Sequence, residues 1–304
     1  MPLKSGTIRF ALLDTTDVKD VPWLMALDSL EEQGYTTEVV NFGKSSLIPP
    51  ALVQGDIDIA VGSTTLNWAA IAQGADIATV VGKVNTSFLL ITNMDVQSCG
   101  DLDGKVLTFA TRQSVGYVMF EEYLDQNCPG TGPEILLISG SANRVAGLEL
   151  GEVDGAYLEL EHWLRLQETA PGEFQVLIDF AKEFPEVQIE TFNVRREWAE
   201  ENREQVEDFV RALLVANRSV IADSQLLRDG IVKHLSIDPA RAQELAEAYL
   251  LEQIWDPNGQ LSSENVQATL DFLSAAGMLP ADLKVEDVAD LSYLNAVLDE
   301  IGRQ

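Results

Sequence analysis

Three consecutive hydroxyl side chains, Ser63, Thr64 and Thr65, follow the apolar run 57–61 and precede an expected helix that begins at Leu66. Free backbone N–H groups and the positive dipole end at the start of a helix favour an anionic or strongly accepting group. One of the three hydroxyls is expected to cap the helix. The other two are predicted to bind a ligand.

A second loop of this kind adds a positive charge. Arg112, Gln113, Ser114 and Val115 follow the apolar run 106–110 and precede another expected helix. Arginine presents a planar fork of donors that suits a carboxylate, sulfonate or phosphate. The loop therefore predicts an anion-binding position, and a surface Arg112 paired with a neighbouring acid is the alternative.

Further candidates lie where other expected strands end, and each has a structural alternative. Helix capping explains the two threonines after the first strand as well as ligand binding does. Turn chemistry alone explains the asparagine and the serines, whereas a glutamate there could accept a hydrogen bond from an amino or hydroxyl group. These candidates are Thr15, Thr16, Asn85, Ser139, Ser141 and Glu159.

Two tryptophans occupy matching places after two polar loops. Trp68 follows the hydroxyl loop and Trp163 follows Glu159. The pair could hold a flat or apolar ligand by stacking. Packing into the core is the commoner fate of a tryptophan and is the alternative.

The hydroxyl loop at Ser63 and the loop at Glu159 each follow a copy of one sequence pattern. Residues 52–60 and 148–156 both read Leu-x-x-Gly-acid-apolar-Asp-x-Ala. Each copy predicts a helix that ends on a glycine, followed by a short strand. Asp58 and Asp154 are assigned to structure, because an acid directly after such a turn typically binds backbone amides. Two such loops, one from each lobe, could close on one ligand from opposite sides.

The order of expected elements defines these lobes. Apolar strand patterns alternate with helix patterns from Thr7 onward, which predicts mostly parallel sheets with loops gathered at the carboxyl ends of the strands. The alternation restarts near residue 92, and from Arg195 the pattern is helical. We expect a first lobe of residues 1–91 plus 190–304, which includes a helical tail, and a second lobe of residues 92–189.

The charge and length of the chain exclude several classes of function. The formal charge of −29, from 20 Lys and Arg against 49 Asp and Glu, would repel nucleic acid and anionic lipid headgroups. The 304 residues suffice for two lobes with separate cores. No run of 18 or more apolar residues occurs, and the start of the sequence lacks the apolar core of a secretion signal.

The cysteines and histidines do not suggest catalysis. Cys99 and Cys128 lie in polar, turn-like stretches and would form a disulfide in an exported protein, two unrelated thiols being the alternative. Together with His162 and His234 they lack the spacing of a zinc site or an iron–sulfur cluster. No Gly-x-Ser-x-Gly, Walker or Gly-x-Gly-x-x-Gly motif occurs. We expect no metal, no cofactor and no catalytic residue.

The ordered set of motifs resembles the solute-binding proteins of bacterial ABC importers, in the branch of nitrate, taurine and alkanesulfonate binders and binders of thiamine pyrimidine precursors. The motifs cover most of the chain. They are residues 52–60 with Gly62-Ser63-Thr64, Asp101-Leu-Asp-Gly-Lys105, residues 148–156, and the tail 192–216 with Trp198-Ala-Glu-Glu-Asn202-Arg-Glu-Gln-Val206-Glu-Asp-Phe209-Val-Arg-Ala212.

The resemblance implies an α/β chain with the two-lobed type II periplasmic binding protein-like fold. It also implies a monomer outside the cytoplasm, periplasmic or lipid-anchored and without its native signal in this sequence, that delivers a small molecule to a membrane permease. We expect a small organic ligand with a polar or anionic end. A heteroaromatic vitamin precursor of the pyrimidine or flavin type is the alternative ligand. An enzyme related to fungal pyrimidine synthases is the alternative activity, although their cysteine-rich iron motif is absent here.

Overall fold

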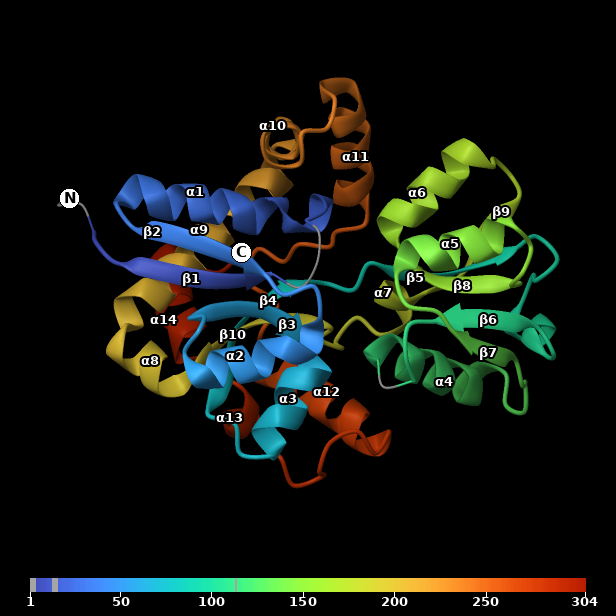
Figure 1. Cartoon of the computed structure of the whole chain (residues 1–304), viewed down its shortest axis with the longest axis horizontal. Coiled ribbons are helices and arrows are strands. Elements are labelled where there is room, and N and C mark those ends of the chain that lie inside the picture. Colours follow the sequence, from blue (N-terminus) through green and yellow to red (C-terminus); the bar gives the residue numbers. More distant parts are fainter. Residues whose placement is uncertain (1–3, 13–15, 113) are drawn as a thin grey trace. The chain divides into compact units, whose positions relative to one another are not determined.

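The computed structural model describes residues 4–12, 16–112 and 114–304, which form two compact units (Figure 1). The first unit comprises residues 1–85 and 186–304, and the second comprises residues 86–185. The chain therefore passes between the units twice. The sequence predicted boundaries after residues 91 and 189, a few residues later than the observed ones after 85 and 185. The first boundary lies earlier because the strand that starts at Phe88 pairs entirely within the second unit.

The first unit contains a five-stranded sheet in the order β2-β1-β3-β10-β4. Strand β10 is antiparallel to both of its neighbours, whereas the other strands run in one direction, so the sheet is mostly parallel as predicted. Its strands are β1 (Thr7–Leu12), β2 (Thr36–Asn41), β3 (Ile59–Ser63), β4 (Ile77–Val84) and β10 (Glu190–Arg195).

The second unit repeats this arrangement in the order β7-β6-β8-β5-β9. Here β5 is the reversed strand. In both sheets the reversed strand is the first one formed after the chain has passed from the other unit. The strands are β5 (Phe88–Asn93), β6 (Val106–Phe109), β7 (Glu134–Leu137), β8 (Gly155–Glu159) and β9 (Phe174–Asp179). Strand β9 had not been predicted from the sequence.

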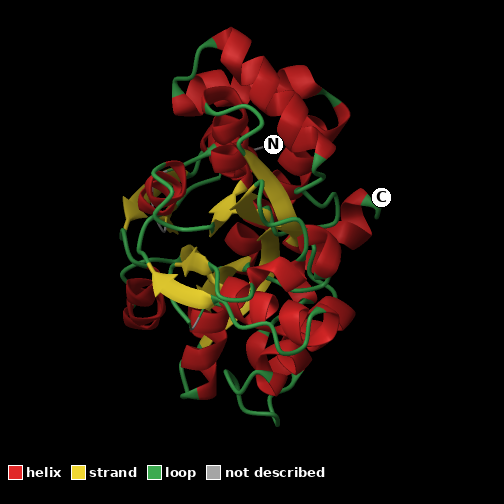
Figure 2. Ribbon diagram, turned by 90° about the vertical axis from the view of Figure 1, so that its right-hand side faces the viewer, coloured by secondary structure: helices red, strands yellow, loops and turns green. Residues whose placement is uncertain are grey.

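Helices flank the strands in both units (Figure 2). In the first unit α9 packs along α1 and also contacts α10 and α14, so the helical tail is part of that unit. The helices of the first unit are η1 (Val18–Asp20), α1 (Val21–Gln33), η2 (Ser45–Leu47), α2 (Ile48–Gln54), α3 (Thr64–Ala72), α8 (Arg196–Glu201), α9 (Arg203–Ala222), α10 (Ser224–Leu235), α11 (Pro239–Leu251), α12 (Ser263–Ala275), α13 (Val285–Val288) and α14 (Ser292–Ile301).

The second unit has fewer helices and a covalent crosslink. Cys99 and Cys128 form a disulfide that joins η3 to the end of α4, with 6.1 Å between their Cα atoms. The helices of this unit are η3 (Cys99–Leu102), α4 (Val115–Asn127), α5 (Ser141–Glu149), α6 (Leu160–Thr169) and α7 (Phe180–Glu183).

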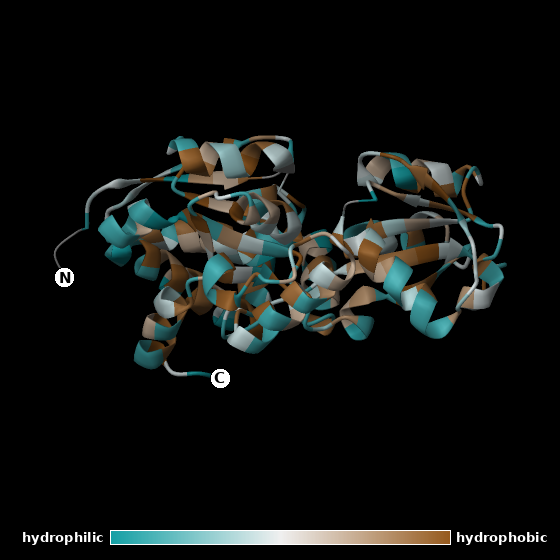
Figure 3. Ribbon diagram, turned by 90° about the horizontal axis from the view of Figure 1, so that it is seen from below, coloured by the Kyte–Doolittle hydropathy of each residue, from teal (hydrophilic) through white to brown (hydrophobic). Residues whose placement is uncertain are grey.

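Each unit has its own apolar core, and Figure 3 shows apolar residues along the strands and hydrophilic residues on the outer helices. Aromatic rings anchor both cores. Phe10 lies 5.2 Å from Phe209 between ring centres in the first unit, and Phe109 lies 5.0 Å from Phe120 in the second. None of the helices in the described part of the chain is long and apolar enough to cross a membrane.

Candidate functional site

The two pattern copies fasten neighbouring strands at their amino ends. Asp58 accepts a hydrogen bond from the backbone N–H of Arg9 at 2.8 Å and pairs with its guanidinium at 2.6 Å. Asp154 accepts from the backbone N–H of Val106 at 2.9 Å and pairs with Lys105 at 3.3 Å. The structural role predicted for both aspartates is confirmed. Most of the candidate ligand-binding side chains lie at the opposite, carboxyl ends of the strands.

The polar edge of the first sheet is the edge where β1, β3 and β4 end and β10 begins. Strand register places Glu190 opposite Ser63 on one side and opposite Val84 on the other. Directly opposed residues of antiparallel strands point to the same face. The carboxylate of Glu190 and the hydroxyl of Ser63 are therefore side-by-side neighbours.

The predicted hydroxyls do not share one role. Ser63 and Thr65 are joined by a hydrogen bond of 3.0 Å between their hydroxyls, and no side chain caps α3, so the expected cap is wrong. Thr64 is fully buried and its backbone N–H donates to Ile189 at 3.0 Å. Thr16 is half-buried beside Asp17, the residue that caps η1. Ser63 and Thr16 are thus partly accessible at, or close to, this edge, whereas Thr64 and Thr65 are buried.

Two other predicted residues of the first unit serve the fold. Trp68 is fully buried, and its indole N–H donates to the Thr79 hydroxyl at 3.0 Å. Trp68 therefore packs in the core, the alternative to ligand stacking, because a ring without exposed surface offers no face to a ligand. Asn85 is fastened to the chain between α11 and α12, since its amide donates to the Gln253 carbonyl at 3.0 Å.

A group of buried and partly exposed charged side chains lies at this edge, and sequence reasoning missed it. We call it the charged cluster; its members are Asp17, Lys19, Asp20, Lys83 and Glu190. The Lys83 ammonium lies 2.7 Å from carboxylate oxygens of both Asp20 and Glu190. The Lys19 ammonium makes looser pairs, 3.4 Å from Asp17 and 3.9 Å from Glu190.

Three members of the charged cluster, Asp20, Lys83 and Glu190, have pKa values shifted toward their charged forms. Burial opposes the charge on Asp20, but the ammonium groups of Lys83 and Lys19 outweigh it and lower the pKa of that carboxyl. The pKa of Glu190 is lowered in the same way, since Lys19 and Lys83 overcome the effect of its burial. For Lys83, the carboxylates of Asp20 and Glu190 overcome burial and raise the pKa of the ammonium.

The polar edge of the second sheet, where β6, β7 and β8 end, begins with an exposed arginine. Arg112 donates to the hydroxyl of Tyr117, which itself donates to Glu121, and its guanidinium lies 5.1 Å from the centre of the Tyr117 ring. Burial, assisted by Glu121, raises the pKa of Tyr117 to about 12. Ser114 caps α4 by accepting from the Tyr117 backbone N–H at 3.3 Å. The loop is thus a pre-formed helix start with a cation beside it.

The other predicted residues of this edge surround a second arginine that sequence reasoning missed. Arg144 is buried and donates to the Ser141 hydroxyl at 2.8 Å and to the Tyr157 carbonyl at 2.9 Å. Burial lowers the pKa of Arg144, while the nearby charge of Glu159 opposes that effect. Ser139 is exposed on the adjoining turn. The arginine therefore holds the ends of β7 and β8 and the start of α5 together.

Stacked aromatic rings lie beneath this edge and limit the size of the side chains that can pack against them. The Tyr157 ring stacks on Phe88 with 4.5 Å between ring centres. A Cβ atom at Gly116, in the first turn of α4, would come within 2.1 Å of that ring. Glycine is therefore required where the helix crosses Tyr157. Val115, the neighbouring predicted residue, is buried.

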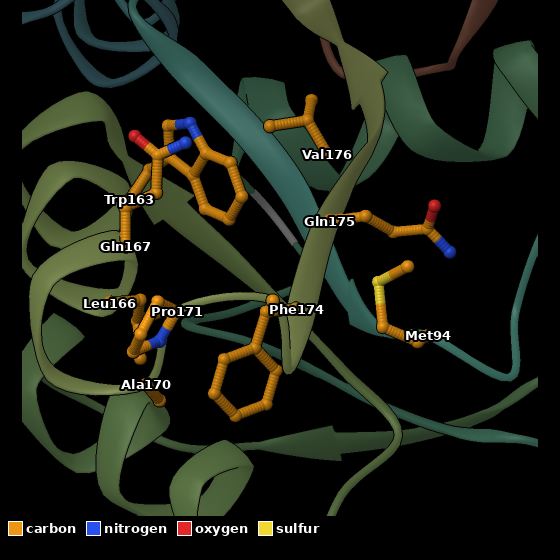
Figure 4. A pocket seen from close by; sticks show the side chains of 10 residues that line it. Met94, Trp163, Leu166, Gln167, Ala170, Pro171, Phe174, Gln175 and Val176 are labelled. Carbon is orange, nitrogen blue, oxygen red and sulfur yellow. The ribbon is translucent and has the colours of Figure 1, made fainter.

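Trp163 lies in a pocket of the second unit rather than at the polar edge. The pocket has a volume of about 450 Å³, and Figure 4 shows Trp163 and Gln167 lining it from α6 and Phe174 and Val176 from β9. Phe174 pairs with the last residue of β5, whereas Glu159 pairs with the first. The pocket thus extends toward the opposite end of the sheet from Glu159.

Two predicted residues, Thr15 and Gln113, lie outside the described residues. Within the described ranges, no group of three or more His, Cys, Asp or Glu side chains is arranged to hold a metal ion. Both cysteines of the chain are consumed by the disulfide.

Comparison with known proteins places the chain by sequence and by fold. A family model described as NMT1/THI5 like matches residues 30–225. A search of curated protein sequences returns no match.

Three solved structures illustrate the likeness in fold. A ligand-binding component of an ABC-type import system from Staphylococcus aureus, with zinc bound, has a TM-score of 0.76 at 15% identity over 97% of this chain and 99% of that chain. A putative periplasmic sulfonate-binding protein of an ABC transporter from Methylobacillus flagellatus has a TM-score of 0.72 at 16% identity over 97% and 94%. A Candida albicans gene product with the generic periplasmic binding protein fold has a TM-score of 0.64 at 16% identity over 98% and 95%. The predicted fold class is confirmed.

Proposed function

The chain belongs to the NMT1/THI5-like family, and we propose that it acts as the solute-binding component of an ABC importer. In this proposal it captures a small organic molecule with a polar or anionic end and presents it to a membrane permease. It is a binding protein and not an enzyme. A solute-binding protein must differ between its empty and loaded states, and the contacts that the ligand makes supply that difference.

The observation that carries the proposal is the pair of sheets with equal strand order, each with hydrogen-bonding side chains where its strands end. Ligands of open α/β sheets bind outside the carboxyl ends of the strands. The names of two similar structures, a ligand-binding component of an import system and a sulfonate-binding protein, favour the same role. Arg112 and the start of α4 at Ser114 favour an anionic end on the ligand.

The disulfide bears on both location and activity. A disulfide between Cys99 and Cys128 suits an oxidising compartment, which supports a place outside the cytoplasm. It also leaves no cysteine of this chain for an iron motif like that of the fungal pyrimidine synthases. A heteroaromatic vitamin precursor remains the second candidate ligand, because the partly exposed rings of Trp163 and Phe174 line a pocket of the second unit.

A thermal-shift panel on the full chain tests the function. Sulfonates, aromatic carboxylates, pyrimidines and flavins are added singly, and we expect one class to raise the unfolding temperature and to change tryptophan fluorescence. Flat responses to all four classes would contradict the ligand assignment. Turnover of a pyrimidine precursor after iron is added would contradict the binding role.

Arg112→Ala tests the anion-binding position. We expect this substitution to weaken binding of the active compound about tenfold, the effect of losing one charge-assisted contact. Arg165→Ala is the matched control, because Arg165 is an exposed arginine on α6 with only a 3.8 Å pair to Glu149. Equal affinities of the two variants would rule out the role of Arg112.

A further inference from the structure

The charged cluster has two layers. Its floor is the buried pair Asp20 and Lys83, to which Glu190 is joined through one oxygen. Its rim consists of Asp17, Lys19 and Glu190, whose side chains are 16%, 11% and 14% exposed. The side chains of Asp20 and Lys83 are buried, whereas those of the rim are partly exposed. The rim is therefore the side from which a small molecule can reach the cluster.

One rim oxygen is poorly satisfied. Glu190 Oε2 accepts from Lys83 at 2.7 Å, whereas Oε1 has only the 3.9 Å pair with Lys19 and accepts no hydrogen bond from the described residues. A distance of 3.9 Å is too long for a hydrogen bond. A nearly buried carboxylate oxygen in this state costs free energy that a donor would recover.

The cluster also carries an excess of negative charge. Among its described members, three carboxylates face two ammonium groups. Protonation does not remove the excess near neutral pH, because Lys83 and Lys19 lower the pKa of both Asp20 and Glu190. Excess charge in a buried site is unfavourable unless a further cation compensates it.

We propose that the rim of the charged cluster binds a protonated amine of the ligand, beside Glu190 Oε1 and the Ser63 hydroxyl. This inference rests on the proposed solute-binding function and names its substrate class as amine-bearing solutes. An ammonium group is a compact cation with three donors, and Glu190 with its cross-strand neighbour Ser63 supplies two acceptors. An anion at this place would increase the excess charge.

Matched pairs of compounds test the inference by calorimetry on the full chain. Each pair differs only in an ammonium or a methyl group at one end: 2-aminoethanesulfonate with propane-1-sulfonate, 3-aminopropanoate with butanoate, and 2-aminoethanol with propan-1-ol. We expect the amine to increase affinity about tenfold within a pair, as one charge-assisted contact would. Glu190→Gln should remove most of that increase, because it keeps the shape but not the charge.

Two further variants control the experiment. Glu197→Gln changes an exposed acid on α8 and should keep the amine preference. Ser63→Ala should reduce the preference with no loss of fold, since its hydroxyl is bonded only to Thr65 among the described residues; this variant serves if Glu190→Gln fails to fold. Equal affinities within every pair, or no binding by any amine, would overturn the inference. Tight binding of amine-free members alone would overturn it and leave the solute-binding function standing.

Discussion

The two sheets share a strand order but differ in what they place at their polar edges. The first carries the charged cluster of five side chains, centred on Lys83 and Glu190, with the Ser63 hydroxyl beside it. The second carries Arg112, exposed beside the Tyr117 ring, and Arg144, buried and bonded to the Tyr157 carbonyl. The equal strand order thus determines where polar side chains lie in each sheet. The identity of those side chains determines which chemical group each edge can bind.

The fastenings at the other ends of the strands differ as well. Asp58 is buried and forms a bidentate pair with Arg9. Asp154 is half-buried, and its partner Lys105 is a third exposed. The second unit has a disulfide instead, with no counterpart in the first. The two units therefore depend on different interactions for their stability, and this difference can be tested.

The largest expected effect concerns the disulfide. Cys99→Ser with Cys128→Ser should lower the free energy of unfolding of the second unit by about 3 kcal/mol, because the crosslink closes a loop of the unfolded chain. Hydrogen exchange should show faster opening in strands β5 to β9 and little change in β1 to β4. Equal destabilisation of both units would contradict their independence. Wild type under reducing conditions should reproduce the variant.

Asp58→Ala should cost about 2 kcal/mol of the free energy of unfolding, since it leaves the backbone N–H of Arg9 without its acceptor and removes an ion pair. Asp154→Ala should cost about 1 kcal/mol, because solvent can replace the half-exposed carboxylate. Urea titration of each variant measures both values. Asp56→Ala, an exposed acid two residues away, is the control and should change stability by less than about 0.5 kcal/mol. A larger cost at Asp154 would reverse the comparison.

Gly116→Ala should cost about 1.5 kcal/mol through overpacking, because its Cβ would overlap the Tyr157 ring. Gly147→Ala, in α5 of the same unit, should be neutral or slightly stabilising, since its Cβ would meet Val153 at an ordinary 3.7 Å. Thermal unfolding of the two variants gives the difference. If both were tolerated alike, the stacked aromatic rings would not restrict the second polar edge as the structure indicates.

The smallest effect is a pH dependence specific to the first unit. The pKa values of Asp20 and Glu190 lie below their ordinary values of 3.8 and 4.5, although burial opposes this, because Lys83 and Lys19 are close. Depressed carboxyl pKa values give stability that is present above the unfolded pKa and lost as pH falls through the folded pKa, below about pH 4. Strands β1 to β4 should therefore open first in acid, as followed by hydrogen exchange. Glu190→Gln should weaken this dependence and Glu197→Gln should not.

Much of the secondary structure was predictable from local pattern. The alternation of strands with helices and the helical tail after Arg195 follow the predicted order, and the aspartates of both pattern copies accept hydrogen bonds from backbone amides as predicted. Strand β9 was not predicted because its sequence, Phe-Gln-Val-Leu-Ile-Asp, lacks strict alternation of apolar and polar residues. It is the outermost strand of its sheet. Of the candidate ligand residues, Trp68 became part of the core because its indole finds Thr79 on a neighbouring strand.

The sequence by itself determined the alternation of strands with helices and the positions of the loops, since these follow from periodicity and from turn residues close together in the chain. The charged cluster and Arg144 were decided by the tertiary structure alone. Lys83 is the penultimate residue of β4, Asp20 ends η1 and Glu190 begins β10, so only sheet pairing brings their charges together. Electrostatic interactions depend on distance in space and on burial, and neither can be read from separation along the chain.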